Sequence, residues 1–215
     1  MNKEGLGTII GLGIIAAVLG FLGFVYSTPP VIVFFWFDVI LFLFSIYFFR
    51  DPQRIPPDDP HIIVSPADGR IILVVDEHER DFLKERVTRI SIFLSLFDVH
   101  VNYTPYEGAV DYVRYNRGKN YRANSDRAFA ENANAFVGLV TPYGKLAFRQ
   151  STGLFTRRIV CRLRIGEHVK TGQKYGMIKF GSRMDVYLPS WAQISCKVGD
   201  RLRAGESVIA RIDEN

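Results

Sequence analysis

Two long apolar runs open the chain, and a mixed, alternating pattern follows them. The first run, residues 5–26, contains no charged side chain, and the second, residues 31–49, contains only Asp38. As helices they would span about 33 Å and about 28 Å, close to the thickness of a bilayer core. Two prolines in the connection Ser27–Pro30 cannot continue a helix. The pattern predicts a membrane-anchoring helical hairpin over residues 1–50.

Charges at the ends of the hairpin predict its orientation. Lys3 precedes the first run, Arg50 and Arg54 follow the second, and the connection carries no positive charge. Positively charged flanks stay in the cytoplasm, so we expect residues 51–215 there, at the cytoplasmic side of the cell membrane. Asp38 keeps one alternative open, a single span plus an interfacial helix, because a carboxylate at membrane depth is costly unless it is protonated or paired.

The pattern changes after a proline-rich segment, residues 51–60. From there the chain consists of short segments rich in β-branched and aromatic residues, separated by turn residues, which is typical of β-strands. We therefore expect a β-rich domain over residues 51–215. The segments expected to be strands are 62–64, 70–75, 89–94, 136–140 and 159–163.

An internal repeat lies near the end of the chain. Residues 165–173 and 198–206 share the pattern apolar-Gly-acid-x-apolar-basic-x-Gly-polar, and a strand-like segment follows each. The glycines suit turns with positive φ, which other residues resist. The repeat resembles biotinyl and lipoyl domains, which are flattened β-sandwiches of two related halves, so we expect a barrel-sandwich fold. Such a fold does not by itself determine function.

Charge and cysteine content narrow the function classes. The formal net charge of +5 falls on the part after the nearly uncharged apolar runs. A basic domain beside a membrane suits anionic lipid headgroups. The basic and aromatic motifs of RNA-binding modules are absent, so we expect no nucleic-acid partner. Cys161 and Cys196 predict no disulfide in the cytoplasm, and they lack metal-site spacing, so we expect no metal.

Three polar residues at turns and strand ends could carry chemistry. Asp68 lies in SPADGR before an expected strand, His100 ends FLSLFDVH, and Ser182 belongs to a Gly-Ser dipeptide that is common in ordinary turns. An acid, a histidine and a serine are the components with which a base activates a hydroxyl nucleophile.

A basic aromatic segment is a further candidate site. Arginine binds phosphate in a bidentate fork, so the segment could contact lipid phosphates at the membrane surface. An ordinary solvated face is the alternative. The candidate residues are Arg114, Arg117, Lys119 and Arg122.

Taken in order, these segments resemble the short form of the phosphatidylserine decarboxylase proenzyme. PADGRI, FLSLFDVHVN, the membrane exit FFRDPQR and above all FGSRMDVYLP carry the resemblance, which covers nearly the whole chain. It implies a maturation triad of Ser182, His100 and Asp68. His100 takes the Ser182 hydroxyl proton while Asp68 holds the imidazole, and the oxygen attacks the carbonyl of Gly181. Elimination of the resulting ester and hydrolysis then leave a pyruvoyl group and ammonia.

The resemblance also implies products and activity. Cleavage yields a β chain, residues 1–181, and an α chain, residues 182–215, headed by the pyruvoyl group. Its carbonyl serves as the electron sink when the serine headgroup of phosphatidylserine loses CO2. The implied partners are the phospholipid substrate, the membrane and further copies in a homo-oligomer. Ester-linked and archaeal ether-linked lipids share the phosphoserine head, so both remain candidate substrates.

One position departs from longer relatives, which carry a second histidine three residues before the catalytic one. Here that position is Phe97, so His100, with Asp98 or water in support, is the candidate for returning a proton to the substrate carbon. Two alternatives keep Ser182 as a serine. One is a membrane-anchored lipoyl-like adaptor without catalysis. The other is a serine hydrolase, for which no nucleophile-elbow sequence is present.

Overall fold

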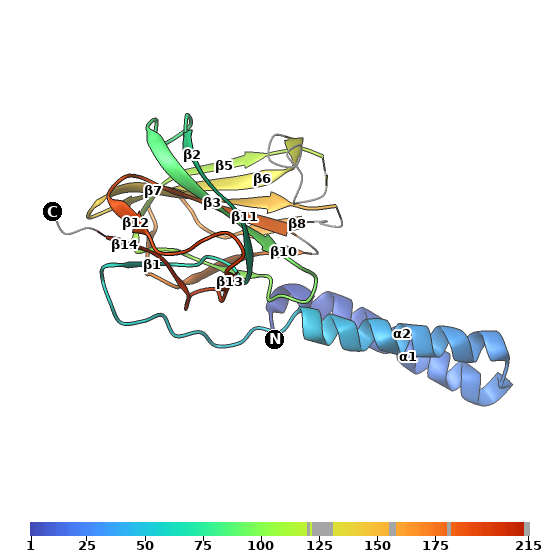
Figure 1. The fold of residues 1–215 in the computed structure, drawn as a ribbon. Helices are drawn as coiled ribbons and strands as arrows, with labels where there is room; N and C mark the ends of the chain where they lie inside the picture. Colours follow the sequence, from blue (N-terminus) through green and yellow to red (C-terminus); the bar gives the residue numbers. More distant parts are fainter. Residues whose placement is uncertain (120, 122–130, 155–157, 180–181, 213–215) are drawn as a thin grey trace. The chain divides into compact units, whose positions relative to one another are not determined.

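The computed structural model describes residues 1–119, 121, 131–154, 158–179 and 182–212. The chain forms two compact units, Met1–Pro52 and Gln53–Asn215. The first is helical and the second is built from β-strands (Figure 1). The expected mainly β domain preceded by two apolar helices is therefore confirmed.

The first unit is a helical hairpin. A short 3-10 turn, η1 (Lys3–Gly5), leads into α1 (Leu6–Tyr26), and α2 (Pro29–Phe48) follows after a tight connection. Ser27 ends α1 in the left-handed conformation, with φ of 51°. The two prolines stand in the first turn of α2, where a missing N–H removes no helical hydrogen bond. Both helices are long and apolar enough to cross a membrane.

Small residues of α1 face aromatic rings of α2. A Cβ added at Gly13 would meet the Phe42 ring, and one added at Gly20 would meet the Phe35 ring. Glycines allow such close approach between apolar helices. Asp38 lies between Phe35 and Phe42 in α2 and is only 6% exposed, and its Oδ2 has no hydrogen-bond partner among the described residues. The carboxyl group is thus sheltered within the hairpin.

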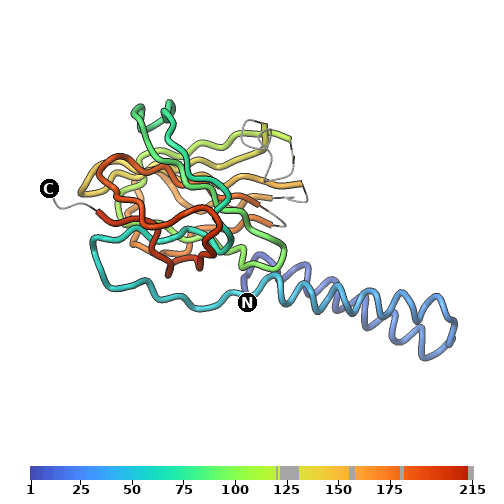
Figure 2. The backbone as a smooth tube through the Cα atoms, in the orientation of Figure 1, coloured from blue at the N-terminus to red at the C-terminus, as the bar shows by residue number. Residues whose placement is uncertain are grey.

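The described part of the second unit contains three antiparallel sheets that curl around a common core (Figure 2). The eight-stranded sheet has the spatial order β13 (Arg201–Leu202), β2 (Gly69–His78), β3 (Arg86–Leu94), β11 (Ser182–Leu188), β7 (Gly144–Thr152), β6 (Asn134–Thr141), β5 (Gly108–Asn116) and β9 (His168–Val169). The three-stranded sheets are β1 (Ile62–Val64), β14 (Val208–Ile212) and β12 (Ala192–Ile194), and β4 (Val101–Tyr103), β10 (Lys174–Lys179) and β8 (Arg158–Cys161).

The first of the five segments expected from sequence to be strands matches β1, and the other four overlap β2, β3, β6 and β8 with different bounds. Side chains alternate between the two faces of a strand, and β11 shows both environments. Met184 and Val186 join the main core, whereas Arg183 and Asp185 lie on the opposite face. This alternation sets the direction of Ser182, which shares a face with Met184.

The repeat seen in the sequence has a matching backbone in the structure. The first glycines of the two copies have φ values of 88° and 97°, and the second glycines have values of 68° and 72°. Gly166 N donates to Val110 O in one copy, and Gly199 N donates to Ile71 O in the other. The two turns therefore dock on equivalent strands, β5 and β2.

A second pair of equivalent segments extends the duplication. Residues 61–71 and 100–110 both read His, three residues, Ser or Thr, Pro, one residue, acid, Gly, one residue, apolar. The carbonyl of His61 accepts from Ile212 N, and that of His100 accepts from Ile178 N. The eight-stranded sheet divides accordingly into two similar halves, β13-β2-β3-β11 and β7-β6-β5-β9. The sequence analysis found only the later pair of segments.

Candidate active site

Ser182 is the first residue of β11, a central strand of the eight-stranded sheet. It therefore lies where the strand begins, at the end of the sheet toward which β3 and β7 run. It pairs with Leu94 at the end of β3 on one side and with Thr152 at the end of β7 on the other. Its side chain is fully buried, and its Oγ has no hydrogen-bond partner among the described residues. Leaving a buried hydroxyl unpaired costs about 1–3 kcal/mol, which is unusual unless the group has another role. Gly181 lies outside the described residues.

His100 is held at the same end of the β unit. It is fully buried and directly precedes β4. Its carbonyl oxygen lies 3.3 Å from the N of Ile178, near the end of β10, and only three residues separate Ile178 from Ser182 in the chain. Ser182 in turn pairs with Leu94, which lies six positions before His100. Only short stretches of chain therefore separate His100 from Ser182 along both routes.

The hydrogen bond to His100 defines its basic nitrogen. Nδ1 lies 2.9 Å from the main-chain oxygen of Asp98. A carbonyl oxygen can only accept, so in the neutral imidazole Nδ1 carries the proton and Nε2 is the basic nitrogen. This is the tautomer required for His100 to take a proton from a hydroxyl group through Nε2.

Asp68 precedes β2 and is bound by an arginine. Arg54 Nη2 donates to its two carboxylate oxygens at 3.1 and 3.3 Å, and Ala204 N donates to Oδ1 at 2.7 Å. Burial raises the pKa of Asp68, and the Ala204 N–H and the Arg54 guanidinium oppose that rise. Since Arg70 pairs with Phe93, next to Leu94, Asp68 also belongs to the Ser182 end of the sheet.

Arg54 is a site residue that the sequence analysis used only for membrane orientation. Besides Asp68 it binds Glu206 at 3.0 Å, so it connects the segment after the hairpin to the turn before β14. Its place in the FFRDPQR segment was the only signal available from the sequence. The pairing with Asp68 could not be read from spacing, because the two residues meet through the fold.

The turn between β3 and His100 determines where Phe97 lies. Asp98 Oδ2 accepts from the N and the Oγ of Ser95, at 2.8 and 2.6 Å, and Asp98 Oδ1 lies 3.3 Å from Arg201. The Asp98 carboxylate therefore closes this turn. Phe97, at its tip, is 66% exposed.

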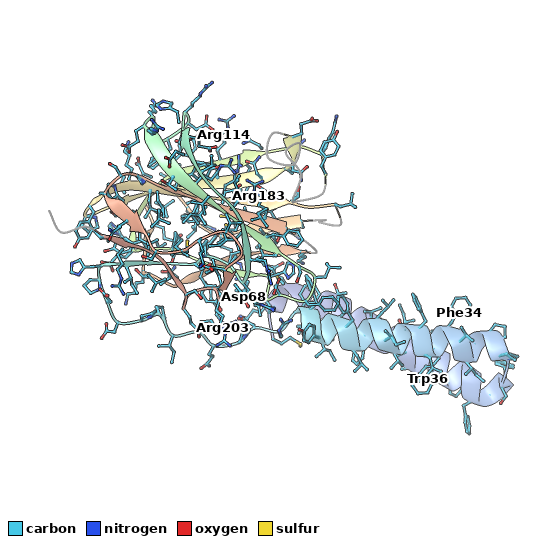
Figure 3. All side chains as sticks on the ribbon, viewed as in Figure 1. Phe34, Trp36, Asp68, Arg114, Arg183 and Arg203 are labelled. Atoms are coloured by element: carbon cyan, nitrogen blue, oxygen red, sulfur yellow. The ribbon has the colours of Figure 1, made fainter. Side chains whose placement is uncertain are left out.

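The four residues of the basic segment differ in their surroundings. Arg114 pairs with Asp81 at 3.1 Å, and Figure 3 shows Arg114 and Asp68 on different sides of the β unit. Lys119 lies 3.4 Å from Glu131. Arg117 is exposed just beyond β5, and Arg122 lies outside the described residues.

The comparisons with known proteins agree on one family. The family model described as phosphatidylserine decarboxylase matches residues 41–210. A phosphatidylserine decarboxylase proenzyme of Desulfotalea psychrophila is 45% identical over 79% of each chain. That of Pelobacter propionicus is 46% identical over 80% of this chain and 79% of its own. That of Chlorobium limicola is 40% identical over 98% of this chain and 99% of its own, a match that includes the hairpin.

The extent of these matches confirms the resemblance stated from the sequence. The family model covers most of the chain, including each of the segments that hold Asp68, His100 and Ser182. This chain belongs to the phosphatidylserine decarboxylase family.

Proposed function

We propose that this chain cleaves itself between Gly181 and Ser182 and then decarboxylates phosphatidylserine, or its archaeal ether-linked counterpart, to the ethanolamine phospholipid. The observation that carries the proposal is the Ser182 hydroxyl, which is fully buried and has no hydrogen-bond partner among the described residues. Such a group is available to react. The products of cleavage are a β chain, residues 1–181, and an α chain, residues 182–215.

His100 acts first, as the base. With Nδ1–H bound to the Asp98 carbonyl, its Nε2 accepts the proton of the Ser182 hydroxyl. The oxygen attacks the carbonyl carbon of Gly181, the peptide C–N bond breaks, and the nitrogen takes the proton. Loss of the Cα proton of Ser182 then expels the Gly181 carboxylate. Water then hydrolyses the resulting dehydroalanine, which releases ammonia and leaves the ketone of the pyruvoyl group.

The pyruvoyl group that remains at position 182 supplies a carbonyl that accepts electrons as the substrate loses CO2, chemistry that no unmodified side chain offers. The serine precursor fits this role, since its side chain is enclosed at the start of β11 and no described residue holds its hydroxyl. His100 Nε2 is also the group that we assign to return a proton to the substrate carbon.

Asp68 stabilises the protonated form of His100 by its negative charge. Its support is its place at the Ser182 end of the sheet, together with the Arg54 and Ala204 contacts that favour the ionised carboxylate. Opposite charges within one buried region interact strongly, because the local dielectric constant is low.

The wider setting is proposed from the chain as a whole. The duplicated turns favour two halves arranged as a barrel-sandwich, as in biotinyl and lipoyl domains. The basic flanks of the hairpin favour insertion in the cell membrane with the β unit, residues 51–215, in the cytoplasm. Arg117 and Lys119 are the described candidates for binding substrate phosphate, and we expect copies of the mature enzyme to associate as a homo-oligomer.

Intact mass spectrometry of the purified full chain tests the proposed maturation. The wild type should give two chains, with the smaller beginning at residue 182, blocked to Edman chemistry and one ammonia lighter than the serine form. Ser182→Ala should remain a single chain. Ser195→Ala, which removes the hydroxyl of an exposed serine, should mature as the wild type does. A folded wild type that stays whole with Ser182 unmodified would favour the non-catalytic adaptor.

A further inference from the structure

Two connections leave the eight-stranded sheet on either side of Ser182. β3 and β7 both run antiparallel to β11, so their last residues flank its first residue. The residues directly after these strands, 95–98 after β3 and 153–154 after β7, therefore lie at the end of the sheet where Ser182 begins β11.

Both connections carry exposed apolar side chains. The turn after β3 carries Leu96, which is half-buried, and Phe97, which is 66% exposed. The connection after β7 carries Leu154, which is 49% exposed. Single exposed apolar residues are common on protein surfaces, but a group of them around a functional site indicates an interaction surface.

Exposed basic side chains lie at the same end. Arg158 begins β8 and pairs with Lys179, the last residue of β10. Arg117 directly follows β5. The last residue of β5 pairs with the first residue of β6, and that residue of β6 pairs with Ser151, the neighbour of Thr152. Arg117 and Arg158 are both exposed. Aromatic and aliphatic side chains mixed with arginine are typical of segments that lie in the interface of an anionic membrane.

We propose that these five residues, Leu96, Phe97, Leu154, Arg117 and Arg158, form a membrane-docking rim. The rim inserts its apolar side chains into the boundary between headgroups and acyl chains of an anionic bilayer, and its arginines bind the lipid phosphates. The contact is made by the β unit itself, in addition to the anchor that the helical hairpin provides. The inference rests on the proposed location of the reactive group at residue 182. Docking of the rim would bring lipid headgroups to the end of the sheet where that group lies.

Fluorescence quenching tests the insertion directly. Full-length Phe97→Trp in vesicles of phosphatidylcholine and phosphatidylserine with brominated acyl chains should show strong quenching, after subtraction of the parent signal from Trp36 and Trp191. Ile165→Trp is the matched control. Ile165 is also 66% exposed, but its turn docks on Val110, near the start of β5 and away from the Ser182 end. Equal quenching at both positions would overturn the proposal. So would the absence of quenching at position 97, which is the result expected if this surface binds a protein instead of a membrane.

Kinetics separate docking from chemistry. Phe97→Ala should lower turnover of long-chain phosphatidylserine in vesicles by about tenfold, the expected effect of losing one interfacial aromatic side chain. Self-cleavage, and turnover of a water-soluble short-chain phosphatidylserine, should stay within about twofold of the parent. Ile165→Ala should change neither. Equal losses of turnover on both substrates, or no loss of turnover in vesicles, would contradict docking. If the unsubstituted protein never cleaves itself, the proposed function is refuted instead.

Discussion

At the scale of single residues, the hydrogen bonds of the candidate site also involve groups outside the three residues expected from the sequence. The imidazole of His100 is oriented by a main-chain oxygen, that of Asp98. The carboxylate of Asp68 is bound by Arg54 and by the Ala204 N–H. Asp68 is thus suited to act through its charge, and Arg54 is suited to control that charge.

Replacing Arg54 should therefore change the pH dependence of self-cleavage. Burial raises the pKa of Asp68 and the Arg54 guanidinium lowers it, so Arg54→Ala should raise the pKa further. The ionised carboxylate then appears only at higher pH, and the acid limb of the cleavage-rate profile should move to higher pH, with a rate about tenfold lower near neutrality. Gel or mass-spectrometric time courses over a pH series measure this shift.

Two further variants distinguish positioning from a merely structural effect. Arg54→Lys keeps the positive charge and should restore most of the profile. Arg211→Ala removes an arginine from a more exposed pair, with Asp59, and should leave the profile unchanged. If Arg54→Ala cleaves more slowly by the same factor at every pH, the electrostatic role of Arg54 is wrong.

At the scale of elements, the side chains of β11 alternate between the apolar core and a charged cluster on the opposite face of the sheet. The residue after Ser182 points to the opposite face, where Arg183, Arg149 and Ser91 surround Asp185. Burial alone would raise the pKa of Asp185, but the arginines and the Ser91 hydroxyl lower it to about 2. This charged cluster pins β11 to β3 and β7, and so it also fixes the start of the strand at Ser182.

Asp185→Asn should destabilise the β unit by about 3 kcal/mol or more, because it leaves buried arginines without their counter-ion. Urea unfolding in the uncleaved Ser182→Ala background measures the change. Asp185 binds no proton in the folded state above its lowered pKa, so its contribution is present at neutral pH and is lost as the pH falls from about 4 toward 2. Asp81→Asn, which breaks the half-exposed pair with Arg114, should cost much less, because water screens an exposed ion pair. Equal costs for both variants would show that the cluster does not hold β11.

The sequence predicted those elements whose signal is local. The apolar runs, the five strand segments and the later glycine repeat all follow from short-range patterns and appear in the structure. The earlier repeat, residues 61–71 and 100–110, was missed because its shared residues are few and its symmetry becomes visible only through the matching bonds of His61 and His100. The strand order, and with it the meeting of Ser182 with Leu94 and Thr152, depends on pairings between distant segments.

At the scale of the whole molecule, the chain combines an apolar helical hairpin, long enough to cross a membrane, with a β unit that has its own core. The main core cluster draws all its residues from Gln53–Asn215, the second compact unit. The described contacts of Ser182, His100 and Asp68 also come from this unit. Folding and maturation should therefore be separable from anchoring.

A chain restricted to residues 53–215 should fold, cleave itself at residue 182 and remain in the supernatant when vesicles of neutral phosphatidylcholine are sedimented. The physical reason is that maturation is intramolecular and needs only the β unit, whereas stable anchoring comes from the apolar helices. With vesicles rich in phosphatidylserine the same chain should sediment in part, because the docking rim and net positive charge still attract it, and high salt should reverse this. Fusion of the fragment to an unrelated membrane helix should restore complete sedimentation without altering the cleavage rate. A folded fragment that fails to cleave would instead show that the hairpin takes part in maturation, and the membrane would then control when the enzyme becomes active.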